Sequence, residues 1–145
     1  MTAEEVTVMA RARRRTIQPD SLHVTVWKGH TLYSHVVAAE GRRLIFVSGQ
    51  VPFDRDGSIV GPGDMRAQIR QVGENVKAAL EAAGASLDDL VKTTTYTTDI
   101  VEFFKHADVR AEYFAIALPT STTVEVRRLA RKEFMVEVEA IAIVD

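Results

Sequence analysis

The strict alternation of residues 134–143 (FMVEVEAIAI) constrains the fold of this chain more than any other feature. Successive side chains of a β-strand point to opposite faces, so one face of this segment is entirely apolar. That face consists of Phe134, Val136, Val138, Ala140 and Ala142. The other face carries two carboxylates, Glu137 and Glu139, which need partners if they are buried. These carboxylates either form a salt-bridge ladder with Arg127 of the preceding strand or position a water molecule.

A second pattern predicts one long helix over residues 65–83. Apolar side chains recur there at helical spacing and form one stripe. The stripe consists of Met65, Ile69, Val72, Val76, Leu80 and Ala83. Asp64 is a suitable N-cap, and Gly84 is the residue type that commonly ends a helix.

A threonine-rich strand and a second helix follow. Residues 90–98 read LVKTTTYTT, with threonine on both faces. One face therefore meets a neighbouring subunit or a polar cavity, or threonine is present only because it favours strands. Asp99 and Glu102 form a capping box for a helix that ends before Pro119. Its buried stripe consists of Phe103, Ala107, Ala111 and Phe114.

The remaining strands are predicted from β-rich runs and turn residues. Residues 22–27 alternate as a short strand does, and residues 33–39 and 43–50 are expected to pair as a hairpin. A second hairpin is expected between residues 123–127 and the last strand. Together these elements predict an α+β domain with helices packed on one face of a mixed sheet.

The length, charge and amino-acid composition of the chain exclude or disfavour several classes of protein. A chain of 145 residues is one ordinary domain, and its net charge of -2 argues against a dedicated nucleic-acid binder. The absence of cysteine excludes disulfides and thiolate chemistry. The basic run 11–15 (RARRR) belongs either to an anionic-surface patch or to a flexible, solvated arm over residues 1–15, with the domain over 16–145. We expect a cytoplasmic protein, because no apolar run could span a membrane and the N-terminus has no signal-peptide core.

The usual catalytic and metal motifs are missing. The four histidines, His23, His30, His35 and His106, have no metal-ligand spacing, and no serine nucleophile elbow occurs. We therefore expect no metal site.

Five short segments spread over the chain carry a family resemblance. They are 47–52 (VSGQVP), 71–84 (QVGENVKAALEAAG), 91–94 (VKTT), 123–126 (TVEV) and 136–142 (VEVEAIA). In this order they resemble the RidA family, also called YjgF/YER057c/UK114, over residues 33–143. The resemblance implies a single chorismate-mutase-like α+β domain with two helices on one face of the sheet. It also implies a homotrimer with a pocket at each subunit interface.

The archetypes of this family are enamine/imine deaminases that need no cofactor. They hydrolyse 2-aminoacrylate-type intermediates to 2-keto acids and ammonia. An arginine pairs with the substrate carboxylate, and a glutamate on the last strand orients water. By resemblance, the glutamate falls on Glu137, the pocket tyrosine on Tyr33 and a serine–glycine pair on Ser48 and Gly49.

The chain departs from the family where the substrate carboxylate is bound. The family arginine falls on Ser121, and a family asparagine falls on Ala107. Serine offers one neutral donor instead of a charged planar fork. Arg127 is six residues further along, too far to replace it within one chain. An arginine of another subunit, such as Arg66, Arg110 or one in the basic arm, is an open alternative. Because the family arginine is missing, we expect weak or no activity on 2-aminoacrylate-like imino acids.

Two functions therefore stand as hypotheses. The first is a RidA-like deaminase or related hydrolase on another small molecule, with Glu137 catalytic and Ser121, Thr122 and Thr123 binding the substrate. The second is a non-catalytic ligand-binding or regulatory trimer on the same scaffold. Ribonuclease activity, attached to some relatives, is disfavoured by the acidic balance and the lack of a suitable histidine pair.

Overall fold

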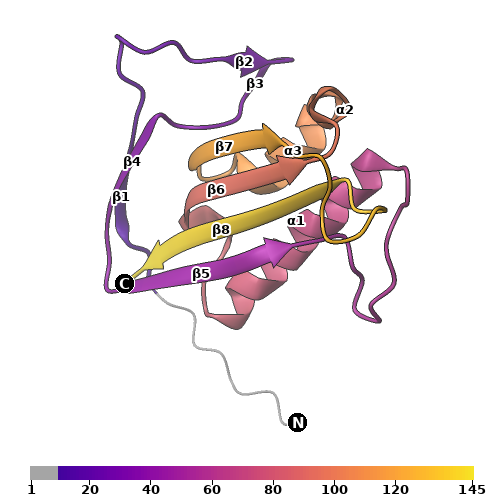
Figure 1. Cartoon of the computed structure of the whole chain (residues 1–145). Helices are drawn as coiled ribbons and strands as arrows, with labels where there is room; N and C mark the ends of the chain where they lie inside the picture. Colours follow the sequence, from indigo (N-terminus) through magenta and orange to yellow (C-terminus); the bar gives the residue numbers. More distant parts are fainter. Residues whose placement is uncertain (1–9) are drawn as a thin grey trace, which may run out of the picture.

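A four-stranded mixed sheet forms the centre of the computed structural model, which describes residues 10–145 (Figure 1). Its strand order is β5-β8-β6-β7. The strands are β5 (Arg43–Gln50), β6 (Leu90–Thr97), β7 (Thr120–Glu125) and β8 (Val136–Val144). β8 runs antiparallel to both β5 and β6, whereas β6 and β7 are parallel. The predicted α+β class with a mixed sheet is confirmed.

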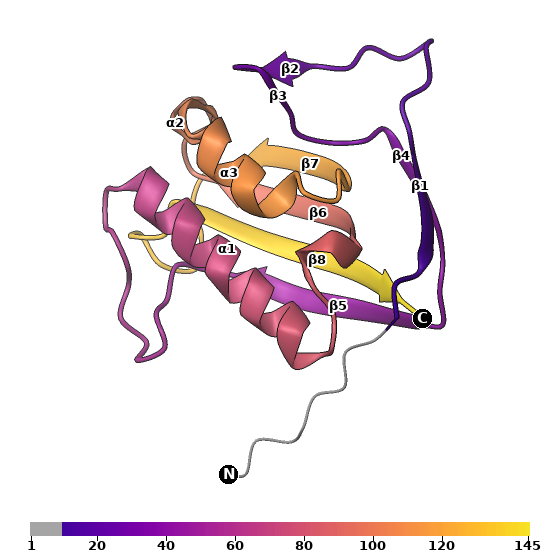
Figure 2. The same ribbon diagram turned by 180° about the vertical axis from the view of Figure 1, so that it is seen from behind.

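The helices all cover one face of this sheet (Figure 2). They are α1 (Met65–Ala82), α2 (Ile100–Lys105) and α3 (Ala107–Phe114), with a short 3-10 turn at Leu87–Asp89. Buried side chains of α1, α3, β6 and β8 make up most of the core between the two layers. Within the described residues, no helix combines the length and apolarity needed to cross a membrane.

The residues predicted to begin and end the long helix do so in α1. The Asp64 carboxylate accepts a hydrogen bond from the Ala67 N–H at 3.0 Å, and Gly84 has φ 79° just beyond the helix. The stripe is buried from Met65 to Leu80, but Ala83 is exposed as the C-cap. The last strand also follows its alternation, with Val136, Val138, Ala140 and Ala142 buried against the helices.

Both predicted hairpins are wrong. β4 (Val36–Glu40) pairs with β1 (Arg13–Ile17) in a separate two-stranded sheet, and β5 turns away to pair with β8. β7 pairs with β6 and not with β8. Arg127 lies beyond the end of β7 and forms no ion pair with Glu137 or Glu139. The Tyr96 hydroxyl donates to Glu139 instead, at 3.0 Å.

The N-terminal segment is tied to the domain. Arg13 to Arg15, expected in the arm, lie in β1, and Arg14 donates to the Asp88 and Ala117 carbonyls at 2.9 Å each. Residues 1–9 of the expected arm lie outside the described residues. Between β1 and β4, the chain makes a small ladder of β2 (Val26–Trp27) and β3 (His30–Thr31), so the strand predicted at 22–27 is reduced to two residues.

The helix predicted after residue 99 is two helices, so three helices rather than two cover the sheet. Asp99 caps α2 by accepting from the Glu102 N–H at 3.0 Å. The Glu102 carboxylate does not complete the capping box, because it contacts His106 and Lys105 at 3.1 and 3.0 Å. The chain leaves helical geometry at His106 and begins α3 at Ala107.

Candidate functional site

A cavity of about 360 Å³ lies where the β2–β3 segment, α2, α3 and β7 meet. Its lining residues are Thr25, Trp27, Leu32, Tyr33, Phe104, Arg110, Ser121 and Thr123. The structure therefore brings together three residues predicted to bind a ligand, Tyr33, Ser121 and Thr123. We call this the Arg110 cavity.

Strand alternation explains which hydroxyls of β7 reach the cavity. Ser121 pairs with the buried Thr93 of β6, so its side chain points to the helix-covered face. Thr122 pairs with Thr94 and points to the opposite face. Thr122 is thus exposed and does not line the cavity with its neighbours.

Arg110 supplies a positive charge beside Ser121. Its side chain comes from α3 of the same chain, is only 4% exposed, and donates from Nη2 to Ser121 Oγ at 2.8 Å. Burial lowers the pKa of Arg110 to about 10, so the guanidinium is still charged at neutral pH. From the sequence, Arg110 was considered only as a residue of another subunit, whereas the structure places it beside Ser121 of its own chain. Arg66, another candidate, is paired with Asp108 at 2.8 Å.

Aromatic side chains line other parts of the cavity. The Trp27 Nε1–H donates to the Phe104 carbonyl at 2.6 Å, and the two rings lie 5.3 Å apart. This contact attaches the β2–β3 segment to α2. The Tyr33 hydroxyl accepts from the Thr25 N–H at 3.1 Å, and its ring meets His35 edge to face.

The remaining predicted residues form a second group elsewhere. Ser48, Gly49 and Glu137 lie at neighbouring positions of β5 and β8, where the pairing of the two strands is interrupted by a bulge. A Cβ on Gly49 would collide with the Glu137 carboxylate, so a larger residue here would require the Glu137 side chain to shift. Bulges often redirect side chains next to active sites.

Glu137 has the electrostatics of a proton acceptor. It is half-buried, and its carboxylate receives no hydrogen bond from residues 10–145. Burial, and secondarily the like charge of Glu139, raises the pKa of Glu137 above its usual value. A carboxylate of this kind is suited to general-base chemistry.

The two groups lie on opposite faces of the sheet. Ser121 and Thr123 face the helices, whereas Glu137 alternates with the buried Val136 and Val138 and faces away from them. We call this second face the open face. One chain by itself therefore does not place Glu137 in the Arg110 cavity.

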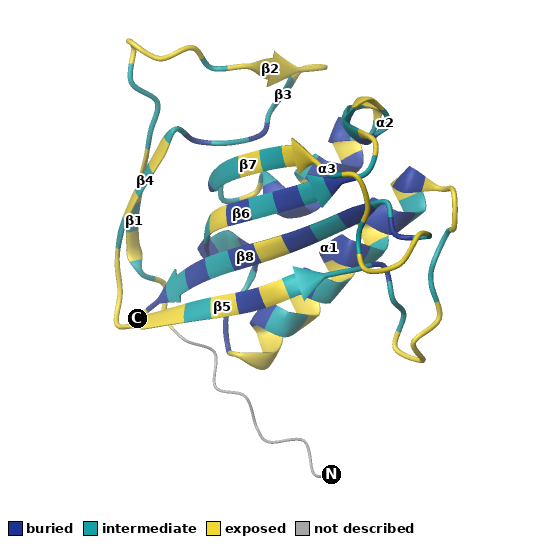
Figure 3. Cartoon of the chain, in the orientation of Figure 1, coloured by how far each residue is buried: buried dark blue, intermediate teal, exposed yellow. Residues whose placement is uncertain are grey.

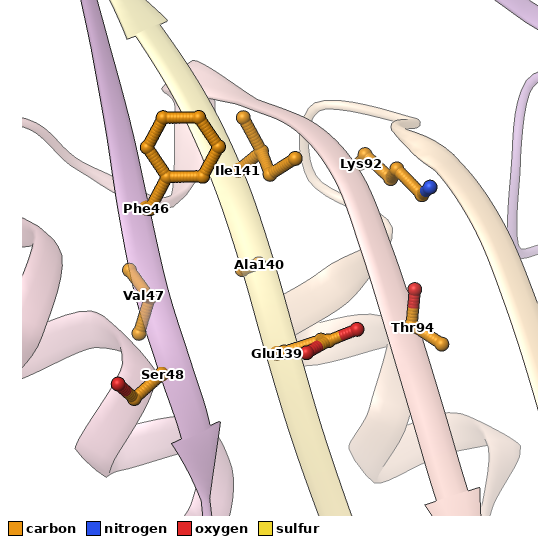
Figure 4. Close-up of a pocket in the computed structure, with 8 residues that line it drawn as sticks. All are labelled: Phe46, Val47, Ser48, Lys92, Thr94, Glu139, Ala140 and Ile141. Carbon is orange, nitrogen blue, oxygen red and sulfur yellow. The ribbon is translucent and has the colours of Figure 1, made fainter.

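No helix covers the open face, and part of it is exposed (Figure 3). Some of the exposed side chains are apolar. Leu44 and Phe46 of β5 are 60% and 71% exposed. A depression of about 320 Å³ crosses the face from Phe46 to Lys92 (Figure 4). Its lining residues are Phe46, Val47, Ser48, Lys92, Thr94, Glu139, Ala140 and Ile141. Contiguous exposed apolar patches on a protein surface often mark interaction sites.

The sequence interpretation missed Arg110, Trp27 and Phe104 as cavity residues. A signal for Arg110 was present, because it stands seven residues after Phe103 on the buried helical stripe. A charged residue on an apolar stripe must have a partner or a function. No cluster of metal-binding side chains occurs among residues 10–145.

Comparisons with known proteins place the chain in a family. The model of the family described as Endoribonuclease L-PSP matches residues 28–144. A RutC family protein of Pyrococcus horikoshii is 44% identical over 76% of this chain and 85% of its own length. The 2-iminobutanoate/2-iminopropanoate deaminase of Escherichia coli K12 is 41% identical over 69% of this chain and 79% of its own.

Solved structures give the same result. A Rid family protein of unknown function from Yersinia pestis matches with a TM-score of 0.79 and 29% identity, over 90% of this chain and 98% of that one. TdcF from E. coli, solved with bound serine, matches with a TM-score of 0.63 and 36% identity, over 70% of this chain and 81% of that one. The chain therefore belongs to the RidA (YjgF/YER057c/UK114) family.

Proposed function

We propose that this protein is a cofactor-independent hydrolase that deaminates a small imine or enamine, as a homotrimer with its sites between neighbouring copies. The observation that carries the proposal is the division of the site residues. One face of the chain offers a binding cavity with a buried cation, and the other offers a carboxylate without a hydrogen-bond donor. Each is half of a hydrolytic site, so two copies are needed to complete one.

Exposed apolar surface supports the association of copies. Leu44 and Phe46 project from the open face, opposite Ile143 and Ile141 of β8, which is the strand that also carries Glu137. A second copy that covers these side chains removes apolar area from water and places a new surface over Glu137. In the proposed trimer, the Arg110 cavity of one copy meets the open face of the next.

The reaction needs only groups that the chain supplies. Glu137 accepts a proton from water while the water oxygen bonds to the imine carbon, and the nitrogen takes up a proton. The resulting carbinolamine then releases ammonia as its hydroxyl becomes a carbonyl. A raised pKa suits Glu137 to this step, because a general base is most effective when its pKa lies near the working pH.

The relatives supply independent support for this substrate class. One homologue is named a 2-iminobutanoate/2-iminopropanoate deaminase, and TdcF holds serine, a small amino acid with a carboxylate. Both names concern small carboxylate-bearing molecules. Arg110 offers this chain a positive charge for such a group, although Ser121 stands where the family arginine is expected.

The test is ammonia release from a panel of imines generated in situ by an amino-acid oxidase. We expect turnover by the wild type and a loss of at least about a hundredfold in Glu137→Gln, since a general base contributes about 10²–10⁴ in rate. Glu81→Gln, an exposed change on α1, is the matched control. Undiminished turnover by Glu137→Gln would remove this residue from the mechanism.

A ligand-binding protein without catalysis is the second candidate. Ser121 favours it, because the position of the arginine that deaminases use is neutral here. Ligand binding by the wild type, with no ammonia released from any imine of the panel, would support this alternative over the hydrolase.

A further inference from the structure

Arg110 is a buried cation with no anion beside it. Among residues 10–145, its hydrogen-bond partner is the neutral Ser121 Oγ, and no carboxylate forms an ion pair with it. Its guanidinium carbon lies 5.6 and 5.8 Å from the ring centroids of Phe103 and Phe104. Burying an unpaired charge is costly, and aromatic faces offset only part of that cost. The arrangement calls for an anion that the chain itself does not provide.

The unused donors of Arg110 are accessible from the cavity. A guanidinium has five N–H donors, and Ser121 takes one of them. Among the described residues, Ser34 Oγ is the one enclosed side-chain polar atom that lacks a partner. The free N–H groups of Arg110 are therefore not fully enclosed by protein, and Arg110 is one of the residues that line the cavity. Their planar fork matches the two oxygens of a carboxylate.

The other walls of the cavity include several apolar side chains. Trp27, Leu32 and Phe104 line the same cavity, whose volume of about 360 Å³ lies in the range that holds ring-sized ligands. Trp27 is 40% exposed, and the hydrogen bond from its Nε1–H to the Phe104 carbonyl fixes the position of the ring. A fixed, accessible aromatic wall favours an aromatic or other ring-sized apolar group over a methyl group.

We propose that the Arg110 cavity binds a carboxylate that carries a ring-sized apolar group, with Arg110 on the carboxylate and Trp27, Phe104 and Leu32 around the apolar group. The inference rests on the proposed function only for the use of this cavity as the ligand site. It names the substrate class as 2-imino acids with a bulky apolar side chain. It also assigns the carboxylate-binding charge to α3 instead of β7.

Trp27 provides a direct measurement, because it is the only tryptophan in the chain. Three inert probes are titrated while its fluorescence is recorded: phenylacetate, propionate and the neutral phenylacetamide. Phenylacetate should bind saturably and at least about tenfold more tightly than either of the others, since each lacks one recognised group. Equal binding of phenylacetate and phenylacetamide, or no binding of phenylacetate at millimolar concentration, would overturn the inference.

Variants then assign the charge to Arg110. Arg110→Met should bind phenylacetate no better than phenylacetamide, and Arg110→Lys should be intermediate, because lysine keeps the charge without the planar fork. Arg66→Met, which removes an exposed arginine paired with Asp108, is the control and should bind as the wild type does. Wild-type selectivity in a folded Arg110→Met variant, checked by circular dichroism, would contradict the assignment.

The binding experiments test this inference separately from the proposed catalytic activity. Phenylacetate binding without turnover of any imine would leave this inference intact and contradict the hydrolase. Turnover of small alkyl imines without phenylacetate binding would contradict only the inference.

Discussion

Gly73 fixes how closely α3, the helix that carries Arg110, approaches α1. It is buried in the middle of α1, directly against the ring of Tyr113 on α3. A Cβ at this position would lie 2.6 Å from both Cδ atoms of that ring. The Gly73→Ala substitution is therefore a sensitive probe of the packing that positions the cavity.

The expected effect is opposite to the usual one. In an exposed helix, replacing glycine by alanine adds about 1 kcal/mol of stability. Here the ring cannot move freely, because the Tyr113 hydroxyl donates to Glu74 at 2.7 Å and the ring packs beside Phe114. Overpacking costs about 1–3 kcal/mol, and the very short contacts place this site at the upper end. We expect a net loss of about 1–2 kcal/mol, or roughly 3–6 °C in Tm.

Thermal and urea denaturation measure this loss. Phenylacetate binding should weaken in parallel, because any shift of α3 moves Arg110 relative to Ser121. In a Tyr113→Leu background the clash is relieved, so Gly73→Ala should there be neutral or stabilising. A higher Tm for Gly73→Ala in the otherwise wild-type chain would refute the reasoning.

Three further predictions concern charge and assembly. Since burial and Glu139 raise the pKa of Glu137, kcat/KM should increase with pH through an ionisation above the usual glutamate range. Glu139→Gln should lower the pKa of that ionisation, and a pH profile unaffected by Glu139→Gln would contradict the assignment. Phe46→Asp should yield monomers in sedimentation velocity and abolish turnover while phenylacetate still binds; an intact oligomer would count against the open face as the interface. Arg66 lowers the pKa of Asp108 to about 2, so Asp108 stabilises the fold above its unfolded pKa of about 3.8, and this stabilisation is lost as the pH falls through 2. The difference in unfolding free energy between wild type and Asp108→Asn should disappear there, and a constant difference would contradict this.

Local patterns predicted the elements that they encode. The helix α1 and the strand β8 could be predicted from the apolar periodicity of their own residues and, for α1, from its capping residues. The pairing of strands is different, because it depends on contacts far apart in the chain. Consecutive strands most often pair, yet β4 pairs with β1 and β5 with β8, and β7 pairs with the preceding β6 and not with the following β8.

The site was predicted in part, for a similar reason. Family motifs indicated Tyr33, Ser121 and Thr123, which the structure brings into one cavity. Arg110 was considered only as a residue of another subunit, because its contact with Ser121 depends on how α3 packs against β7. The position of Glu137 on the opposite face follows from strand alternation, but its role depends on the trimer proposed above, which strand alternation does not predict.

A mixed-trimer experiment tests the central claim most directly, namely that Arg110 and Glu137 of different copies complete one site. Arg110→Met and Glu137→Gln chains are co-refolded at equal amounts, and ammonia release is measured against each parent alone. Random assembly gives an intact pair at about one-quarter of the interfaces, so we predict about one-quarter of the wild-type activity from two inactive parents. Mixed trimers that remain as inactive as their parents would contradict the shared site.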